Sequence, residues 1–197
     1  MKKILHVAET IKGGVATVIR TISDSPEGDA ANYELVYLVP EDQARELHGI
    51  GAQQIRTFPR TGRNVPSLLR FAWRLTQVML KEKPDVVHLH STFSGVIGRC
   101  VCVLLRPWRK PKIVYCPHAF SFLMESSPTK QKVYAWIERV LQKVTDVIIC
   151  VSQYELDKAA RFGIERKRMR LIYNGIHRRD EAAKIANPEP IHLLFVG

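Results

Sequence analysis

The sequence predicts an α/β fold: a doubly wound, mostly parallel, Rossmann-like sheet with helices on both faces. Apolar runs of strand length alternate with segments of helical spacing through most of the chain, as is typical of parallel sheets. The stretch from Pro84 to Ser91 is a near-continuous apolar run entered through a Pro-Asp turn, as expected for a strand buried on both faces. With 197 residues, of which 46% are hydrophobic, the chain can bury the core that such a sheet needs.

The first half of the chain is predicted to contain four strands with helical segments between them. The strands are expected at Ile4–Ala8, at Tyr33–Val39, at Gln54–Phe58 and within Pro84–Ser91. Apolar spacing predicts a helix over Val15–Ile22 and one or two helical turns over Asp42–His48. A longer helix includes Pro66, a residue favoured in the first helical turn, and runs to about Lys83. Its expected packing side consists of Leu68, Leu69, Ala72, Leu75, Val78 and Met79.

The second half continues the alternation. Further strands are expected at Lys112–Cys116, Asp146–Val151 and Met169–Tyr173. Helices are expected from about Ser94 to Leu105 and over Thr129–Val144. The second of these is amphipathic, with apolar residues at i, i+3, i+4 and i+7: Val133, Trp136, Ile137, Val140, Leu141 and Val144. A last helix is capped by Ser152, with Glu155 at the spacing of a capping box, and ends near Gly163.

The end of the chain differs in composition from the rest. Residues 1–176 form the predicted Rossmann-like domain, residues 177–190 are polar and linker-like, and residues 191–197 are an apolar, strand-like run. We interpret this run as the first strand of a second domain that lies beyond the chain. The alternative is an extra edge strand of the first sheet.

Composition limits the location of the protein. No apolar run reaches the ~18 residues needed to span a bilayer, and Ile4–Ala8 is too short for the core of a signal peptide. We therefore expect a cytoplasmic protein. The four cysteines lie in apolar surroundings, without a CxxC pair or a disulfide-like framework, and are predicted to be reduced core residues: Cys100, Cys102, Cys116 and Cys150.

The net charge of +11 is concentrated in clusters. Residues 56–83 carry seven basic side chains against one acid, and residues 99–112 carry five against none. Nucleic acid, anionic lipid and phosphorylated small molecules are compatible partners. Nucleic acid is not expected, because the sequence has no helix-turn-helix, zinc knuckle or RNP-like strand. The basic-aromatic stretches Arg70–Arg74 and Arg106–Lys110 could hold the protein peripherally on an anionic membrane; solvated charged surfaces are the alternative.

A glycine pair separates the first predicted strand from the following helix. Gly13 and Gly14 would let the backbone approach a ligand, and the amino terminus of the helix would attract an anion. The spacings G-x-G-x-x-G and G-x-x-x-x-G-K-[ST] are both absent, which excludes those two phosphate-binding fingerprints. An ordinary tight turn is the alternative.

Histidines lie at or near the carboxyl ends of two predicted strands, the edge of an open parallel sheet where ligands bind. His88 and His90 lie two apart on one strand and so point to the same side. A metal pair is conceivable, but no carboxylate or third histidine stands at a supporting spacing, so we expect packed or hydrogen-bonded imidazoles and no metal. His118 follows the next strand, where a neutral imidazole could hydrogen-bond a sugar hydroxyl; a structural role is equally compatible.

Several motifs, in order, resemble the amino-terminal domain of the GT-B retaining glycosyltransferases of family 4. The resemblance covers essentially the whole chain. It rests on a strand leading into Gly13-Gly14, on Pro84–Ser91, on His118, on Val147–Ser152 and on Leu171–Ile176. The terminal run Leu193–Gly197 resembles the first strand of the family's carboxy-terminal domain.

The resemblance implies two Rossmann-like domains facing each other across a cleft, with most of the acceptor site in the first and the nucleotide-sugar in the second. It also implies transfer to an acceptor hydroxyl with retention of configuration and generally without a metal. Gly13 and Gly14 match the glycine loop beside the donor diphosphate. His118 matches the histidine that helps to orient the donor sugar. Asn174 and Gly175 match the turn at the start of the interdomain crossover, although an Asn-Gly hinge turn is the simpler interpretation.

Other positions are implied less directly. His90, Ser91 and Thr92 lie at the rim where acceptor contacts would be expected. The segment Ala119-Phe120 departs from the family pattern, in which glycine or aspartate is commoner after the histidine. The family's donor machinery, a basic pair and an E-x7-E motif, belongs to its second domain, and nothing in this chain supplies that constellation. The chain alone is therefore predicted to fold without transferring sugar.

Two classes of function remain after this comparison of motifs. The first is the acceptor-side domain of a glycosyltransferase that makes a surface polysaccharide or glycolipid, with a nucleotide-sugar as substrate and no cofactor. Its basic surfaces would suit a lipid-phosphate-linked acceptor. The second is a basic α/β binding module for an anionic membrane or nucleic acid. A nucleotide-dependent oxidoreductase is disfavoured by the missing glycine fingerprint.

Overall fold

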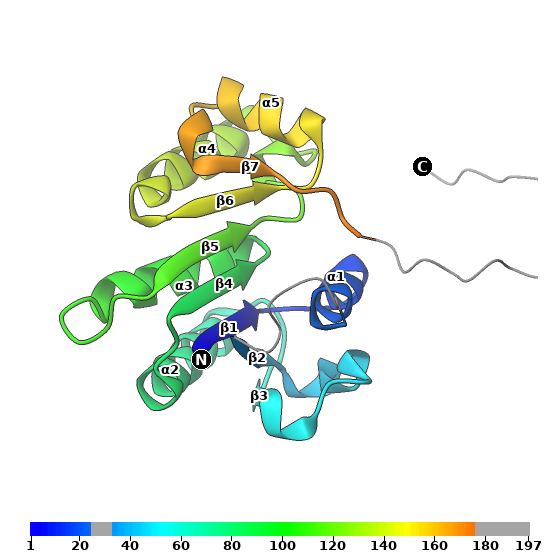
Figure 1. Cartoon of the computed structure of the whole chain (residues 1–197). Coiled ribbons are helices and arrows are strands. Elements are labelled where there is room, and N and C mark those ends of the chain that lie inside the picture. The colour runs from blue at the N-terminus through cyan, green and yellow to red at the C-terminus, as the bar shows by residue number, and fades with distance from the viewer. Residues whose placement is uncertain (25–32, 176–197) are drawn as a thin grey trace, which may run out of the picture.

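The computed structural model describes residues 1–24 and 33–175, which contain a seven-stranded, all-parallel sheet (Figure 1). The strand order is β3-β2-β1-β4-β5-β6-β7. The strands are β1 (Lys2–Ala8), β2 (Tyr33–Pro40), β3 (Ile55–Phe58), β4 (Val86–His90), β5 (Lys112–Cys116), β6 (Val147–Cys150) and β7 (Met169–Leu171). The predicted doubly wound α/β fold is therefore confirmed.

Helices cover both sides of this sheet. They are α1 (Gly14–Ser23), α2 (Val65–Glu82), α3 (Thr92–Leu104), α4 (Pro128–Leu141) and α5 (Gln153–Arg161), with short 3₁₀ segments η2 (Glu41–Leu47), η3 (Ala52–Gln54), η4 (Ser121–Leu123), η5 (Gln142–Val144) and η6 (Arg166–Arg168). The chain runs outward from β1 to β3 and then returns to β4 on the other side of β1. Because parallel crossovers are right-handed, this reversal places α1 on one side of the sheet and α2, α3 and α4 on the other (Figure 1).

The two sides have separate cores. Leu5 and Val7 of β1 belong to the larger core beneath α2, α3 and α4. Ala8 and Tyr37 belong to a smaller core beneath α1. Since side chains alternate along a strand, His6 of β1 shares the α1 side of the sheet with Ala8.

The predicted inward faces of two helices require correction. Leu69 was expected in the packing side of α2, but it is 65% exposed, and Phe71 is fully buried instead. On α4 the apolar residues Val133, Trp136 and Val140 are exposed, whereas Ala135 and Glu138 are buried.

A buried ion pair accounts for the orientation of α4. The guanidinium of Arg99 on α3 donates to both carboxylate oxygens of Glu138, at 2.8 and 3.0 Å, and Tyr115 Oη donates to the same carboxylate at 3.1 Å. A buried charge requires its partner, so Glu138 must face the sheet. The apolar stripe of α4 is thereby turned outward.

The remaining expectations have mixed outcomes. All four cysteines are free, and three are buried, but Cys100 is exposed. Ser152 caps α5 as expected, because its Oγ accepts from the Glu155 N–H at 3.1 Å. The predicted linker at 177–190 and the predicted strand at 191–197 lie outside the described residues.

Candidate functional site

The carboxyl ends of the strands meet at one edge of the sheet, and the polar residues singled out in the sequence gather there. The switch in chain direction falls between β1 and β4, which is where open α/β sheets bind their ligands. The loop after β1, the tip of β4 and the loop after β5 all border this point.

The loop after β1 is open above its glycines. Gly13 has a φ of 79°, and neither Gly13 nor Gly14 has any neighbouring atom within 4 Å of the position that a Cβ would occupy. The loop is held from below by Gln43, whose Oε1 accepts from the Ile11 N–H at 2.8 Å. No acidic residue lies in the first turn of α1. Of the first N–H groups of α1, that of Ala16 donates to Ile11 O at 3.1 Å, which leaves those of Gly14 and Val15 available to an anion.

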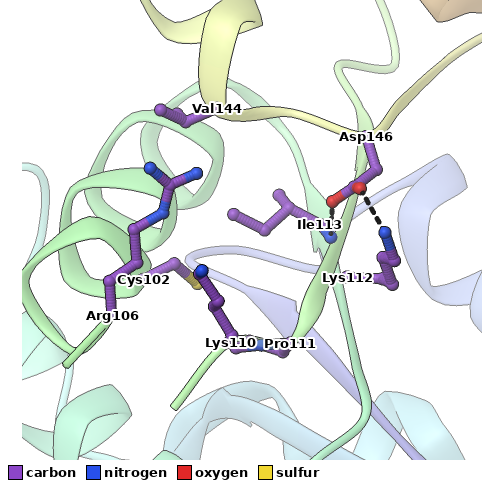
Figure 2. A pocket seen from close by; sticks show the side chains of 8 residues that line it. All are labelled: Cys102, Arg106, Lys110, Pro111, Lys112, Ile113, Val144 and Asp146. Carbon is purple, nitrogen blue, oxygen red and sulfur yellow. Dashed lines mark hydrogen bonds and ion pairs between the residues drawn. The ribbon is translucent and has the colours of Figure 1, made fainter. Parts of the chain in front are cut away.

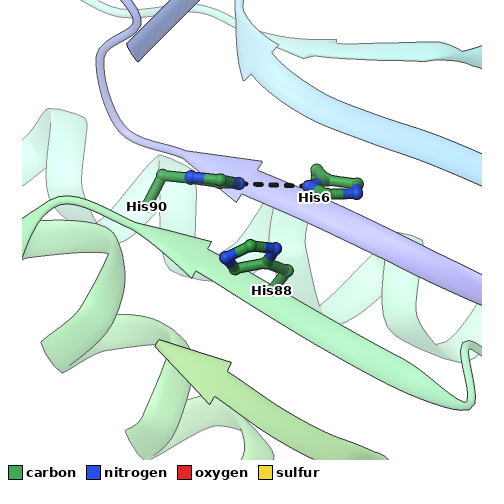
Figure 3. A group of neighbouring side chains, drawn as sticks. All are labelled: His6, His88 and His90. Carbon is green, nitrogen blue, oxygen red and sulfur yellow. Dashed lines mark hydrogen bonds between the residues drawn. The ribbon is translucent and has the colours of Figure 1, made fainter. Parts of the chain in front are cut away.

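Three histidines from three segments form a hydrogen-bonded chain. His6 Nδ1 lies 3.1 Å from His90 Nε2, as Figure 3 shows, and His90 Nδ1 lies 3.0 Å from His118 Nε2. In each bond one ring nitrogen must donate and the other accept. The protonated nitrogen of His118 is therefore coupled, through His90, to that of His6.

These imidazoles are neutral at physiological pH. Burial lowers the pKa of His6 and of His118 to about 4. Burial, followed by the neighbouring imidazoles, lowers the pKa of His88 and His90 well below the ordinary value. A neutral imidazole can both donate and accept, which suits contact with a sugar hydroxyl.

His88 joins this group and alters the expectation about metals. Ring nitrogens of His6, His88 and His90 lie within 4.8 Å of one another (Figure 3). His88 Nε2 is buried without a hydrogen-bond partner in the described part of the chain. Neutral imidazole is a ligand for Zn²⁺ and related cations, so this group could hold one.

The third histidine was missed in the sequence because it comes from another strand. His6 pairs in register with His88 across β1 and β4. The sequence did contain one indication of this pairing. His6 stands two positions before its strand ends at Ala8, and His88 stands two positions before its strand ends at His90. The expectation from sequence spacing that no third histidine supports His88 and His90 is therefore wrong.

Ser91 and Thr92 form the tip between β4 and α3. Ser91 has a φ of 72°, unusual for a residue other than glycine, and its N–H donates to Cys116 O at 3.0 Å. Thr92 Oγ1 lies 2.7 Å from Ser121 Oγ. The tip is thus tied to β5 and to the segment after His118.

The loop after β5 holds His118 in an uncommon backbone conformation. His118 and Ala119 have φ values of 53° and 98°. The buried carboxylate of Glu155 accepts from the Ala119 N–H at 3.1 Å and from the Val151 N–H at 2.8 Å, which joins this loop to the end of β6. Glycine would suit φ at Ala119, so this departure from the family pattern has a local cost.

A hollow of about 260 Å³ lies beside this loop and is lined by His118, Ser152, Tyr154 and Glu155. Burial raises the pKa of Glu155, and its backbone hydrogen bonds oppose that rise. Both of its oxygens are already engaged by the backbone. Glu155 therefore shapes the His118 loop, and His118 is among the residues that line this hollow.

Asn174 and Gly175 come close to the histidine chain after β7. They line a cavity of about 90 Å³ together with His90 and with Thr21 of α1. A Cβ at Gly175 would lie 3.0 Å from Thr21 Cγ2, so a larger residue would press on α1. The structure thus brings the predicted interdomain turn next to His90.

A basic rim beside the glycine loop was not anticipated. The buried carboxylate of Glu9 accepts from Arg60 Nε at 2.8 Å and lies 3.7 Å from Arg63 Nε. The Arg63 guanidinium also lies 5.3 Å from the centre of the Phe93 ring. These pairs join residues between 30 and 54 positions apart, so no local sequence pattern marks them. The two arginines share the single negative charge of Glu9, which stands four residues before Gly13 in the sequence, so one positive charge remains in excess.

Comparison with known proteins identifies relatives of this arrangement. The family model of Glycosyltransferase Family 4 matches residues 12–179. An uncharacterized 41.2 kDa protein in the cps region of Klebsiella pneumoniae is 38% identical over 98% of this chain, which spans 55% of that relative. The Escherichia coli UDP-Gal:alpha-D-GlcNAc-diphosphoundecaprenol alpha-1,3-galactosyltransferase is 28% identical over 52% of this chain and 26% of its own length.

Solved structures show the same fold. The lipopolysaccharide outer core galactosyltransferase WaaB matches 88% of this chain and 46% of its own, with a TM-score of 0.64 and 18% identity. HepE of Anabaena, in complex with UDP and glucose, matches 89% of this chain and 45% of its own, with a TM-score of 0.61 and 17% identity. The family match over most of the chain is the stronger finding: this chain belongs to glycosyltransferase family 4.

Proposed function

We propose that this chain is the acceptor-side domain of a glycosyltransferase that moves a sugar from a nucleotide-sugar to a lipid-linked or polysaccharide acceptor, with retention of configuration and without a metal. The observation that carries the proposal is the placement of neutral, hydrogen-bonded His118 at the same sheet edge as the open Gly13-Gly14 loop. Both relatives point the same way, since one acts on a diphosphoundecaprenol-linked acceptor and the other is encoded in a cps region.

In this proposal the departing nucleoside diphosphate is stabilised without a cation. The free N–H groups at the start of α1 face the diphosphate across Gly13 and Gly14, and the helix dipole favours the charge that develops there. Arg60 and Arg63 are paired with Glu9, four residues before Gly13, and would add positive charge to the same loop. These groups would supply the electrostatic stabilisation that a bound divalent cation provides in other enzymes.

His118 orients the donor sugar through a hydrogen bond between its Nδ1 and a hydroxyl, because its Nε2 is bonded to His90. In this structure Nδ1 lies 3.7 Å from Cys116 Sγ, a weak partner. The chain through His90 to His6 couples the position of the proton on His118 to the tautomers of the two inner histidines. Ser91 and Thr92 contact the acceptor at the rim, and Asn174-Gly175 leads toward the nucleotide-sugar domain. Because the resemblance places the family's basic pair and E-x7-E motif in the second domain, the 197-residue chain alone is expected to be inactive.

Donor turnover tests the proposal directly. The full-length protein is incubated with a panel of nucleotide-sugars, and release of nucleoside diphosphate is measured for wild type and for His118→Ala. His48→Ala is the matched control, because His48 is an exposed histidine on a different segment. We expect at least a hundredfold loss for His118→Ala and no change for His48→Ala. Equal turnover in all three proteins would overturn the role of His118.

The binding-module hypothesis makes the opposite prediction. It requires tight, salt-sensitive binding to DNA or RNA, or membrane binding, without turnover of any donor in the full-length protein. The match to family 4 disfavours it, since that family consists of transferases.

A further inference from the structure

The outer surface of the helical layer formed by α2, α3 and α4 carries all three tryptophans of the chain. Trp73 on α2 is 67% exposed, Trp108 in the loop after α3 is 71% exposed, and Trp136 on α4 is 60% exposed. Tryptophan is highly buried on average in soluble proteins. Three such residues on one helical layer therefore require an explanation.

Exposed aliphatic side chains lie near each of the three tryptophans along the sequence. On α2, Val65 and Leu69 are exposed and precede Trp73 at intervals of four residues, which places them on one face of the helix. On α4, the exposed residues Val133 and Val140 flank Trp136 at helical spacing. Two exposed residues near the end of α3, Val103 and Leu104, lie between these two groups in the sequence. We call the exposed residues of α2, α3, α4 and the 105–110 loop the tryptophan face.

The charge of the tryptophan face has a single sign. Within α2, α3 and α4, all of which the structure describes, the only acids are Glu82 and Glu138. Glu82 is paired with Lys3 at 3.0 Å and Arg56 at 2.8 Å, and Glu138 is paired with Arg99. The exposed charged residues of these helices and the loop are all basic: Arg70, Lys81, Arg106, Lys110, Lys130, Lys132 and Arg139.

A basic hollow lies at one end of this face. It has a volume of about 290 Å³ and is lined by Arg106, Lys110 and Lys112, among others (Figure 2). Lys112 is paired with Asp146 at 3.1 Å, as the dashed line in Figure 2 shows. In the described part of the chain no carboxylate pairs with Arg106 or Lys110. These two cations are available to a phosphate group.

We propose that the tryptophan face docks on an anionic lipid bilayer. Tryptophan prefers the headgroup region, aliphatic side chains enter the acyl boundary, and Lys and Arg reach back to lipid phosphates. A protein partner would need an acidic surface shaped to this face, whereas an anionic bilayer presents negative charge to all of its basic residues at once. Docking would be peripheral, since no helix among the described residues has the length and apolar character to cross a bilayer.

The geometry of the layer suits such docking. An apolar hollow of about 270 Å³ between α2, α3 and α4 is lined by Leu68, Val96 and Tyr134, and also by Thr92 at the cleft rim. Membrane contact through this layer would therefore bring the rim of the cleft close to lipid. This consequence rests on the proposed function, but docking itself does not.

Sedimentation with lipid vesicles tests the docking. Binding of the 197-residue chain is compared on vesicles of equimolar phosphatidylglycerol and phosphatidylcholine and on vesicles of phosphatidylcholine alone, without any donor or acceptor. One variant removes charge from the face: Arg70→Gln, Arg106→Gln and Lys132→Gln. The control removes the same charge elsewhere: Arg45→Gln, Arg161→Gln and Lys167→Gln. A third variant replaces Trp73, Trp108 and Trp136 with Ser.

We expect binding to anionic vesicles only. Each basic residue near such a surface contributes about fivefold, so the face variant should bind about a hundredfold more weakly and the control should lose much less. Wild-type tryptophan fluorescence should shift to the blue and be quenched by brominated lipid, and the Ser variant should lose binding while its circular dichroism is unchanged.

Other results would overturn docking through this face. Equal losses in the face variant and the control would mean that net charge alone attracts the vesicles. Unchanged binding by the Ser variant would exclude the tryptophans. A dimer detected by light scattering that the Ser variant abolishes, with no vesicle binding by wild type, would assign the face to a second copy of the chain. Because the assay needs no transfer, its failure is separable from failure of the proposed function.

Discussion

His90 Nδ1 and His118 Nε2 lie 3.0 Å apart, so the buried strand β4 hydrogen-bonds the histidine that lines the hollow beside the loop after β5. His90 in turn bonds His6 of β1. Two neighbouring strands of the switch point thus act on the orientation and tautomer of His118, although neither inner histidine faces the hollow beside it.

The first prediction concerns this chain of imidazoles. In the full-length protein, His90→Leu should lower kcat about tenfold to a hundredfold, because His118 would no longer be held in one orientation and one tautomer. Long-range ¹H–¹⁵N NMR should show a single His118 tautomer in the wild type and a mixture in the variant. His88→Leu is the matched control, since His88 touches the same group without bonding His118. An unchanged His118 tautomer in His90→Leu would contradict the prediction.

The second prediction is a loss of stability in acid. The pKa of His6 is lowered by burial to about 4 in the folded state, against about 6.5 when unfolded. A lowered histidine pKa contributes stability that is present above pH 6.5 and is lost as the pH falls toward 4. At pH 5 the loss from His6 amounts to about 2 kcal/mol of unfolding free energy. His88 and His90 act in the same direction.

Urea unfolding at pH 7 and pH 5 measures this loss. The variant His88→Leu removes one buried titrating group that has no hydrogen-bond partner among the described residues. It should therefore show a smaller difference between the two pH values than the wild type. Equal unfolding free energies of the wild type at both pH values would show that the imidazoles are not desolvated as described.

The third prediction concerns the carboxylate that joins two loops. Glu155→Gln should lower the unfolding free energy by about 1–3 kcal/mol, because one of the N–H groups of Ala119 and Val151 would then face an amide nitrogen instead of an oxygen. Glu165→Gln, at an exposed position, should change it by less than about 0.5 kcal/mol. Thermal or urea unfolding would decide, and equal effects of the two substitutions would argue against the bridging role.

The fourth prediction separates the two adjacent glycines. Gly13→Ala should destabilise the protein by about 1–3 kcal/mol, since φ 79° with ψ −142° is a backbone conformation that is strained for any residue with a Cβ, although that Cβ meets no atom. Gly14 begins α1 and has an ordinary φ. Gly14→Ala should therefore leave stability unchanged or raise the unfolding free energy by up to about 1 kcal/mol. Relative to the wild type, the unfolding free energy should therefore fall in Gly13→Ala and stay the same or rise in Gly14→Ala. Two equal losses would mean that the loop is not as open as described.

Local patterns in the sequence are sufficient to predict the order of elements and the strand exits. Turn residues and apolar runs mark β4 and β5, and this placed His90 and His118 at one edge of a parallel sheet. Helix bounds agree to within a few residues for the same reason: caps and periodicity are encoded locally.

Interactions between distant segments could not be predicted in this way. His6 joins the histidines only through the register of β1 with β4, and Glu9 meets Arg60 only through the return of the chain after β3. The orientation of α4 depends on the pair Arg99–Glu138, which turns Trp136 outward against its apparent amphipathic pattern. In each case a pairing across the fold overrides the periodicity of a single segment.

The most direct test of the central claim is nucleoside diphosphate release by the full-length protein from a panel of nucleotide-sugars, in the presence of a lipid-linked acceptor and with or without EDTA. Transfer without a metal predicts release from one donor at the same rate in both conditions, with retention of the anomeric configuration in the product. Release that EDTA abolishes and a divalent cation restores would contradict the metal-free account and direct attention to the cluster of His6, His88 and His90. Absence of release from every donor would contradict the proposed transfer itself.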